Sequence, residues 1–250
     1  MKEKLMKIEN FQRFGKRSFP KLSIIIPVYN EEKTILEVIK KVKEEKIKRI
    51  KKEIIVVDDF SLDGTRKILI NLKDSNVKIL YHQKNRGKGS AIKTGLKHAT
   101  GDIILIQDAD LEYNPEEYPK LLQPILENKT KIVYGSRFEV IRKNLKSMYK
   151  LHYFGNVFLT IVTNLLYGSK ITDVETGYKV FRKEVIKDIN IKAKRFDFEP
   201  EITSKFLKRN YKIMEVPISF VGRKFAEGKK ITWKDGVKAL YYLIKYRLVD

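Results

Sequence analysis

The feature that most constrains the fold is a repeated pairing of short aliphatic runs with amphipathic segments. The runs predict strands at 22–28, 53–58, 77–82, 102–107 and 131–135, and the intervening segments predict helices at 31–46, 63–73, 88–98 and 115–127. A continuous aliphatic run suits a strand that is covered on both faces. Alternation of this kind predicts an α/β fold with a mainly parallel sheet and helices on both faces.

Polar residues follow the expected strands. Asp58 and Asp59 end the second aliphatic run, and Asp108-Ala109-Asp110 follows the run at 103–106. Because open α/β sheets bind ligands at the carboxyl ends of their strands, we expect these side chains to line one site. If strand geometry persists, carboxylates at i and i+2 point the same way and can hold one Mg²⁺ or Mn²⁺. For an isolated motif the alternative is an Asp-rich surface turn.

A series of motifs extends this pattern along most of the chain. It comprises IIPVYNEE at 25–32, VVDDFSLDGT at 56–65, NRGKGSA at 85–91, DAD at 108–110, TDVETGYK at 172–179, FDFE at 196–199 and EVPISF at 215–220. In this order and spacing, the motifs resemble the inverting glycosyltransferases of family two, which have the GT-A (Rossmann-like) fold. The later motifs are similar to the polyprenyl-phosphate sugar synthases. The resemblance covers roughly residues 21–247.

The resemblance implies a nucleotide pocket lined by Pro27, Tyr29, Glu31, Val57 and Asp59. In such a pocket the ring of Tyr29 offers a face to the base, and the two carboxylates accept hydrogen bonds from base or ribose donors. For Asp59 the alternative is an Asx turn. Lys88 stands between two glycines at an expected helix start, which suits an anion but is also common in turns.

The resemblance also implies a metal-dependent reactive centre. Asp108 and Asp110 would hold the divalent ion against the donor diphosphate, where it acts as a Lewis acid and a template. Ala109 would line the substrate, and Glu112 is a candidate third ligand. A Gln is common at this position in dolichol-phosphate mannose synthases, so Glu112 departs from their pattern.

Basic residues near later strand ends are candidates for the phosphate groups. Arg137 follows the expected strand 131–135, and Arg223 follows an expected strand at 214–220. Lys229 lies in the basic loop after Arg223. Guanidinium forks match phosphate oxygens, although surface decoration is the alternative for any single Arg. An alcohol acceptor would need a general base, for which Asp173 or Glu175 is the candidate. A polyprenyl phosphate is already anionic, so Asp173 would then orient the acceptor or a basic residue.

The formal net charge of +22 requires an anionic partner or another explanation. Nucleic acid, an anionic membrane surface and lysine-rich solvated faces are the alternatives. Because no recognised nucleic-acid module occurs, we expect no nucleic-acid partner and favour the membrane surface. The absence of cysteine excludes disulfides, thiolate catalysis and Cys-ligated zinc, and is compatible with a reducing cytosol.

Two segments fit contact with a membrane surface. Residues 153–167 are mostly apolar or aromatic, and residues 233–248 repeat apolar side chains at helical spacing with basic residues between them. Neither has the run of about twenty apolar residues that spans a bilayer. Each is either an interfacial helix or an ordinary core helix. Membrane contact is therefore expected to be peripheral, at the cytoplasmic face, or through a membrane partner subunit.

The sequence contains no composition break or internal repeat that marks a domain boundary. We expect residues 1–20 to be a mobile leader and residues 21–250 to form one GT-A domain that ends in amphipathic helices. The resulting hypothesis is a transfer of hexose from GDP-mannose or UDP-glucose to a polyprenyl (dolichyl-type) phosphate. The alternatives are another acceptor, such as a glycolipid or polysaccharide, and a non-catalytic protein that binds nucleotides or nucleic acid.

Overall fold

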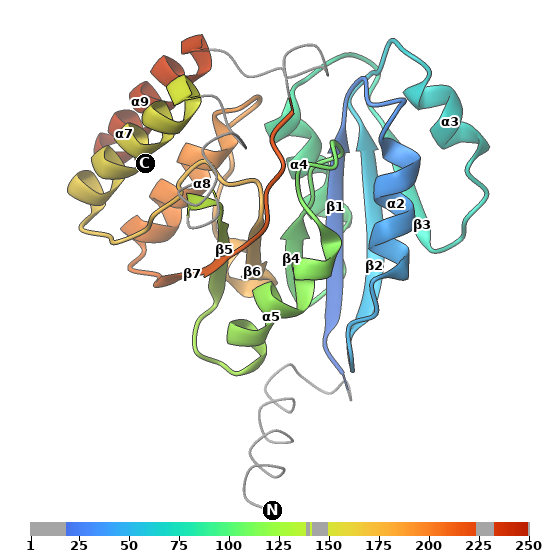
Figure 1. Ribbon diagram of the computed structural model, residues 1–250, viewed down its shortest axis with the longest axis horizontal. Coiled ribbons are helices and arrows are strands. Elements are labelled where there is room, and N and C mark those ends of the chain that lie inside the picture. Colours follow the sequence, from blue (N-terminus) through green and yellow to red (C-terminus); the bar gives the residue numbers. More distant parts are fainter. Residues whose placement is uncertain (1–18, 139–140, 142–149, 224–232, 250) are drawn as a thin grey trace, which may run out of the picture.

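The structure is a computed structural model that describes residues 19–138, 141, 150–223 and 233–249. Most of the expected leader, residues 1–18, lies outside the described residues. Seven strands of the described chain form one sheet in the order β3-β2-β1-β4-β6-β5-β7 (Figure 1). These strands are β1 (Lys21–Val28), β2 (Lys51–Asp58), β3 (Val77–Tyr81), β4 (Ile103–Ile106), β5 (Ile132–Ser136), β6 (Lys179–Arg182) and β7 (Ile213–Pro217).

Helices cover both faces of this sheet. The helices α2 (Ile35–Glu44), α3 (Thr65–Asn71) and α5 (Tyr118–Leu126) pack on one face, and α4 (Lys88–His98) and α8 (Phe198–Lys208) on the other. The described residues also form α7 (Lys150–Tyr167), α9 (Trp233–Leu248) and the short 3₁₀ turns η1 (Pro115–Glu117) and η3 (Lys183–Ile186). All strand pairs are parallel except those of β6, which runs antiparallel to β4 and β5. The expected fold class is confirmed.

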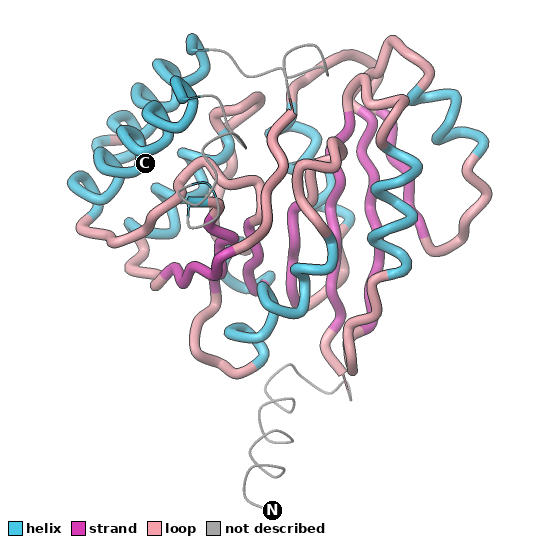
Figure 2. The backbone as a smooth tube through the Cα atoms, viewed as in Figure 1, coloured by secondary structure: helices cyan, strands magenta, loops and turns pink. Residues whose placement is uncertain are grey.

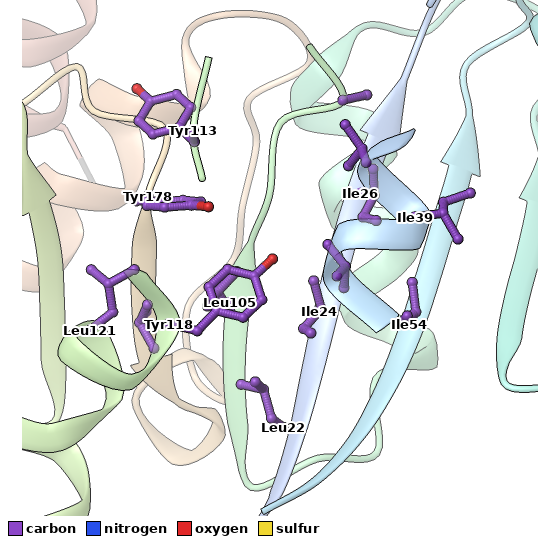
Figure 3. Packing of buried hydrophobic residues seen from close by; sticks show 14 of the residues in the cluster. Leu22, Ile24, Ile26, Ile39, Ile54, Leu105, Tyr113, Tyr118, Leu121 and Tyr178 are labelled. Carbon is purple, nitrogen blue, oxygen red and sulfur yellow. The ribbon is translucent and has the colours of Figure 1, made fainter. Parts of the chain in front are cut away.

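The aliphatic strands divide their side chains between two cores. On β1, Ile24 and Ile26 pack with α2, α3 and α5, whereas Ile25 packs with α4 and α8 on the other face. Figure 3 shows part of the first core, where Leu105 of β4 and Tyr118 of α5 lie beside Leu22 and Ile24 of β1. Because both faces are covered, continuous aliphatic runs are stable here and an alternating pattern is not required.

Several predicted boundaries differ from the structure. The expected helix 31–46 begins only at Ile35, because Asn30 has a left-handed backbone (φ 51°) and a turn follows it. The expected helix 115–127 is divided into η1 and α5, and the expected strand 214–220 ends at Pro217. The sequence patterns did not predict β6, because this strand has only four residues and carries Lys179 and Arg182.

The helices α7 and α9 pack against each other at one end of the molecule, beyond α8 (Figures 1 and 2). Leu159 of α7 and Leu243 of α9 belong to a third apolar cluster, and the hydroxyl of Tyr167 donates to the carbonyl of Leu243 at 2.7 Å. Each helix therefore has a buried face that fixes it to the domain, and the side chains on its other face are exposed. The buried face is the one expected of a core helix, and the exposed face carries the apolar side chains expected of an interfacial helix.

Candidate active site

Three loops at the carboxyl edge of the sheet are tied to one another. After β1, the backbone N–H of Asn30 donates to the hydroxyl of Ser61 at 2.9 Å, and its side-chain oxygen accepts from the N–H of Leu62 at 2.8 Å. The hydroxyl of Thr34 donates to the carbonyl of Ala109 at 2.7 Å. The ends of β1, β2 and β4 thus meet, as predicted, where the strand order changes direction and open α/β sheets bind ligands.

Each of these loops contains a residue with a left-handed backbone: Asn30 (φ 51°), Phe60 (φ 65°) and Leu111 (φ 62°). This conformation suits Asn, but for Phe and Leu it costs on the order of 1–3 kcal/mol. Leu111 turns the chain directly after Asp110, so that the N–H of Glu112 donates to Asp110 Oδ1 at 3.2 Å. The surrounding structure therefore stabilises a strained turn that gathers acidic side chains.

The Asp108–Asp110 motif lies in a turn, because β4 ends at Ile106. The strand alternation invoked in the sequence analysis consequently does not position its carboxylates. Asp108 Oδ1 lies 2.7 Å from the ammonium of Lys88, and Asp110 Oδ2 lies 3.0 Å from the guanidinium of Arg223. Ion pairs to two other elements thus orient the two acids.

Lys88 begins α4 and bridges two acids. Its ammonium lies 2.8 Å from Glu199 Oε1 as well as 2.7 Å from Asp108. Burial lowers the pKa of Lys88, but these two carboxylates raise it well above its usual value, so the side chain stays charged. The next helix amides, of Gly89 and Ser90, donate to backbone carbonyls of the 194–195 loop. An anion at this helix start would therefore meet Lys88 rather than those two amides.

Arg223 connects the loops after β7, β1 and β4. Its guanidinium lies 3.0 Å from Glu31 Oε2 and 3.0 Å from Asp110 Oδ2, and its backbone N–H donates to Glu112 Oε1 at 2.7 Å. The following residues 224–232, which include the predicted substrate residue Lys229, lie outside the described residues.

The acids at this edge repel one another. Burial, followed by the charges of Glu112 and Asp108, raises the pKa of Asp110 to about 7. Crowded carboxylate oxygens fit the preference of Mg²⁺ or Mn²⁺ for hard ligands. Among the described residues, no group of three or more His, Cys, Asp or Glu side chains is arranged to hold a metal ion. To bind such an ion, Asp108 would have to give up its ion pair with Lys88, and Asp110 its ion pair with Arg223.

Arg137 and Asp173 form a buried pair directly after β5. Arg137 donates from its backbone N–H, Nε and Nη2 to the Asp173 carboxylate at 3.0, 2.8 and 2.7 Å. Asp173 is fully buried and Arg137 is 6% exposed. The guanidinium also lies over the ring of Phe220, 5.2 Å from its centroid. Because both carboxylate oxygens are bound to Arg137, this geometry suits an orienting role for Asp173 better than proton transfer.

Asp59 joins two loops through its buried carboxylate. It accepts from the N–H groups of Arg86 and Gly87 at 2.9 and 2.6 Å, and lies 2.7 Å from His82 Nδ1. These contacts show a structural role for Asp59 at the edge of the site. Val57, by contrast, is fully buried in the core shared with α4 and α8.

A cleft of about 910 Å³ runs across this edge. The predicted residues that line it are Pro27, Tyr29, Glu31, Asp59, Lys88, Asp108, Ala109, Asp110, Glu112, Arg137 and Arg223. Within the described part of the chain, Val57 and Asp173 are not among the lining residues. Most of the predicted site residues therefore border one space.

The cleft continues to residues that the sequence analysis did not assign to the site. Glu199 lines it from α8, and its only sequence signal was the FDFE motif at 196–199. Phe158 and Leu159 of α7, and Val237 and Leu240 of α9, line the far end. The apolar spacing of these helices was visible in the sequence, but not their approach to the strand ends.

A sequence model described as Glycosyl transferase family 2 matches residues 23–189, more than half of the chain. The chain belongs to this family. It is therefore a glycosyltransferase, and the predicted family resemblance is confirmed.

Similar proteins occur in archaea. An uncharacterized protein of Methanocaldococcus jannaschii is 31% identical over 98% of this chain and 99% of its own length. A UDP-N-acetylglucosamine–dolichyl-phosphate N-acetylglucosaminyltransferase of Methanococcus voltae is 32% identical over 90% of this chain and 95% of its own. A dolichol-phosphate mannosyltransferase of Pyrococcus furiosus is 33% identical over 84% of this chain, which spans 59% of that relative.

Solved structures share the fold. Glucosyl-3-phosphoglycerate synthase of Mycobacterium tuberculosis with Mn²⁺ and UDP-glucose has a TM-score of 0.70 and 18% identity, covering 96% of this chain and 82% of its own. The same enzyme with Mg²⁺ and UDP has a TM-score of 0.70 and 18% identity, and the match covers 97% of this chain and 84% of that enzyme's chain. This likeness establishes the GT-A fold.

The buried pair at Arg137 generates a prediction about stability. Asp173→Asn leaves a buried guanidinium without its counter-charge, so we expect a loss of about 3–5 kcal/mol in the free energy of unfolding. Urea denaturation measures this change. Glu184→Gln is the control, because Glu184 pairs with Lys131 at 2.9 Å on the exposed surface, where a pair contributes about 0–1 kcal/mol. Equal losses in the two variants would contradict the assigned role.

Proposed function

We propose that the protein transfers a hexose from a nucleoside diphosphate sugar, such as GDP-mannose or UDP-glucose, to a polyprenyl phosphate at the cytoplasmic membrane face. One observation carries the proposal: a single cleft joins the acidic strand ends to apolar side chains of α7 and α9. An acceptor with an anionic head and a long apolar tail matches both ends of such a cleft. The Methanococcus relative is a dolichyl-phosphate N-acetylglucosaminyltransferase and the Pyrococcus relative a dolichol-phosphate mannosyltransferase, which supports a dolichyl phosphate acceptor.

The proposed reaction is a direct displacement with inversion. A phosphate oxygen of the acceptor attacks the anomeric carbon, the bond from that carbon to the diphosphate oxygen breaks, and the nucleoside diphosphate leaves. The attacking oxygen is already anionic, so no general base is needed. Arg137, oriented by Asp173, and Arg223 are the proposed phosphate-binding residues, since an anionic acceptor near a diphosphate requires cations.

A divalent ion is the proposed cofactor. Asp108 and Asp110 would hold Mg²⁺ or Mn²⁺, with Glu112 as a third ligand, and the ion would stabilise charge on the leaving diphosphate. The raised pKa of Asp110, to about 7, supports this proposal because it reflects burial and uncompensated neighbouring carboxylates. Lys88 and Arg223 would then turn toward substrate oxygens. The nucleotide side of the pocket is proposed to include Tyr29 and Glu31.

Membrane binding is proposed to use the outer face of α7 and α9. The face is a stripe of exposed apolar side chains at helical spacing: Phe154, Phe158, Ile161 and Leu165 on α7, and Val237, Tyr241, Ile244 and Leu248 on α9. No helix among the described residues has the length and apolar character needed to cross a bilayer. An amphipathic face combined with a net charge of +22 favours peripheral attachment to an anionic surface.

The proposed acceptor can be tested by transfer assays. Purified enzyme with Mn²⁺ is incubated with GDP-mannose, UDP-glucose or UDP-N-acetylglucosamine, and with a polyprenyl phosphate or the matching polyprenol. We expect transfer to the phosphate alone, with inverted anomeric configuration by NMR. Preference for the polyprenol or for a glycolipid hydroxyl would overturn the acceptor assignment.

Asp110→Asn tests the proposed metal. We expect transfer to fall at least a hundredfold, because the variant loses an anionic ligand, and we expect the free energy of unfolding to be unchanged or higher, because a repelled carboxylate is removed. The control is Asp188→Asn, which changes an exposed acid away from the cleft. Wild-type rates in excess EDTA would be inconsistent with metal dependence.

The membrane face can be tested with vesicles. We expect the protein to bind anionic vesicles at low salt and to dissociate at high salt, since exposed charges are screened beyond about 8 Å at physiological ionic strength. Leu165→Asp should weaken binding at least tenfold, because this side chain is 80% exposed on the stripe. Ile70→Asp is the matched control, since Ile70 is 64% exposed on α3 at the opposite end of the molecule (Figure 1). Equal affinity for neutral vesicles would argue against this mechanism.

A further inference from the structure

Two glutamate oxygens in the cleft are buried without a hydrogen-bond partner. They are Oε1 of Glu175 and Oε2 of Glu199, for which no donor exists among the described residues. Both side chains line the cleft, and Glu199 is only 5% exposed. Buried polar atoms in native proteins are almost always hydrogen-bonded. These two oxygens in one cleft are available to hydrogen-bond donors of a ligand.

The position of Glu199 relates these acceptors to the reactive centre. Its other oxygen, Oε1, lies 2.8 Å from the ammonium of Lys88, which in turn lies 2.7 Å from Asp108. A single lysine thus separates Glu199 from the motif proposed to hold the metal and the donor diphosphate. The group attached to that diphosphate is the transferred sugar, so the sugar is the part of the donor that would reach Glu199.

Glu175 faces the same space. Glu175 and Glu199 line the same cleft, and burial, followed by the charge of Glu199, raises the pKa of Glu175 to about 7. The neighbouring cations are engaged elsewhere: Lys179 donates to the carbonyls of Val174 and Thr176 at 2.9 Å, and Arg137 donates to Asp173. Neither cation supplies a hydrogen bond to the two buried oxygens.

We propose that Glu175 and Glu199 accept hydrogen bonds from hydroxyl groups of the transferred sugar and restrict the donor to neutral sugars. The inference rests on the proposed function. A neutral hexose presents several O–H groups and no acid, which matches two unpartnered carboxyl oxygens. A uronic acid would bring a third carboxylate against the two glutamates in a buried site, where like charges repel most strongly. Selection against acidic sugars follows from the same pair.

Glu175→Gln is the sharper variant, because Glu199 also holds Lys88. Calorimetric titration with Mn²⁺ measures the Kd of the nucleotide sugar that the wild type transfers, of its free nucleoside diphosphate, and of the matching nucleotide uronic acid. We expect Glu175→Gln to raise the Kd of the nucleotide sugar at least tenfold and the Kd of the free diphosphate less than twofold. We also expect the ratio of the Kd of the nucleotide uronic acid to the Kd of the nucleotide sugar to fall at least fivefold. Glu199→Gln should also weaken binding of the nucleotide sugar, and Glu184→Gln on the surface is the control.

Ligand-free thermal unfolding separates this role from a structural one. Because Glu175→Gln replaces an unpartnered carboxylate, its midpoint temperature of unfolding should equal or exceed that of the wild type, while its affinity for the sugar nucleotide falls. Wild-type affinity for the nucleotide sugar in both variants would overturn the inference and leave the proposed function standing. An equal loss of affinity for the sugar nucleotide and the free diphosphate in Glu175→Gln would also overturn it. If the wild type binds no nucleotide sugar at all, the proposed function fails and the inference fails with it.

Discussion

The architecture of the site depends on the neutralisation of carboxylates that the strands bring to one edge of the sheet. Three sets of ion pairs carry this neutralisation: Lys88 with Asp108 and Glu199, Arg223 with Asp110 and Glu31, and Arg137 with Asp173. Each cation comes from a different part of the chain, so the pairs also fix the relative positions of distant elements. A buried acid without its partner is strongly destabilising, which makes the arrangement mutually dependent.

The same pairs explain how a charged substrate could enter a buried site. Lys88 and Arg223 neutralise the acids of the Asp108–Asp110 turn in the ligand-free protein, and these acids are the proposed metal ligands. A divalent ion bound by these acids would release Lys88 and Arg223 from their ion pairs. The anionic oxygens of the diphosphate would then pair with the two released cations. Such an exchange keeps Asp108 and Asp110, and the two cations that they release, paired before and after binding. Pairing at both stages avoids the large penalty of burying an isolated charge.

The sequence predicted the elements that have strong local signals. Aliphatic runs identified β1 to β5, and the polar residues after β1, β2 and β4 identified the edge at which they meet. Local patterns could not identify β6, since its Lys179 resembles a surface residue and is buried only because Val174 and Thr176 provide carbonyl acceptors. Pairings such as Arg137 with Asp173 were likewise hidden, because they depend on tertiary contacts across 36 positions of the chain.

The helices α7 and α9 place two properties on one surface. Their amino-terminal halves contribute Phe158 and Val237 to the cleft lining, and both side chains also belong to the exposed apolar stripe. Near their carboxyl ends, Arg247 of α9 donates to the carbonyl of Leu166 at 2.8 Å, so the two helices are joined beyond the cleft as well. A lipid surface covering the stripe would therefore lie directly at the apolar mouth of the cleft. The tail of an amphipathic acceptor would remain in apolar surroundings while its charged head moved toward Arg137, because one pair of helices borders both environments.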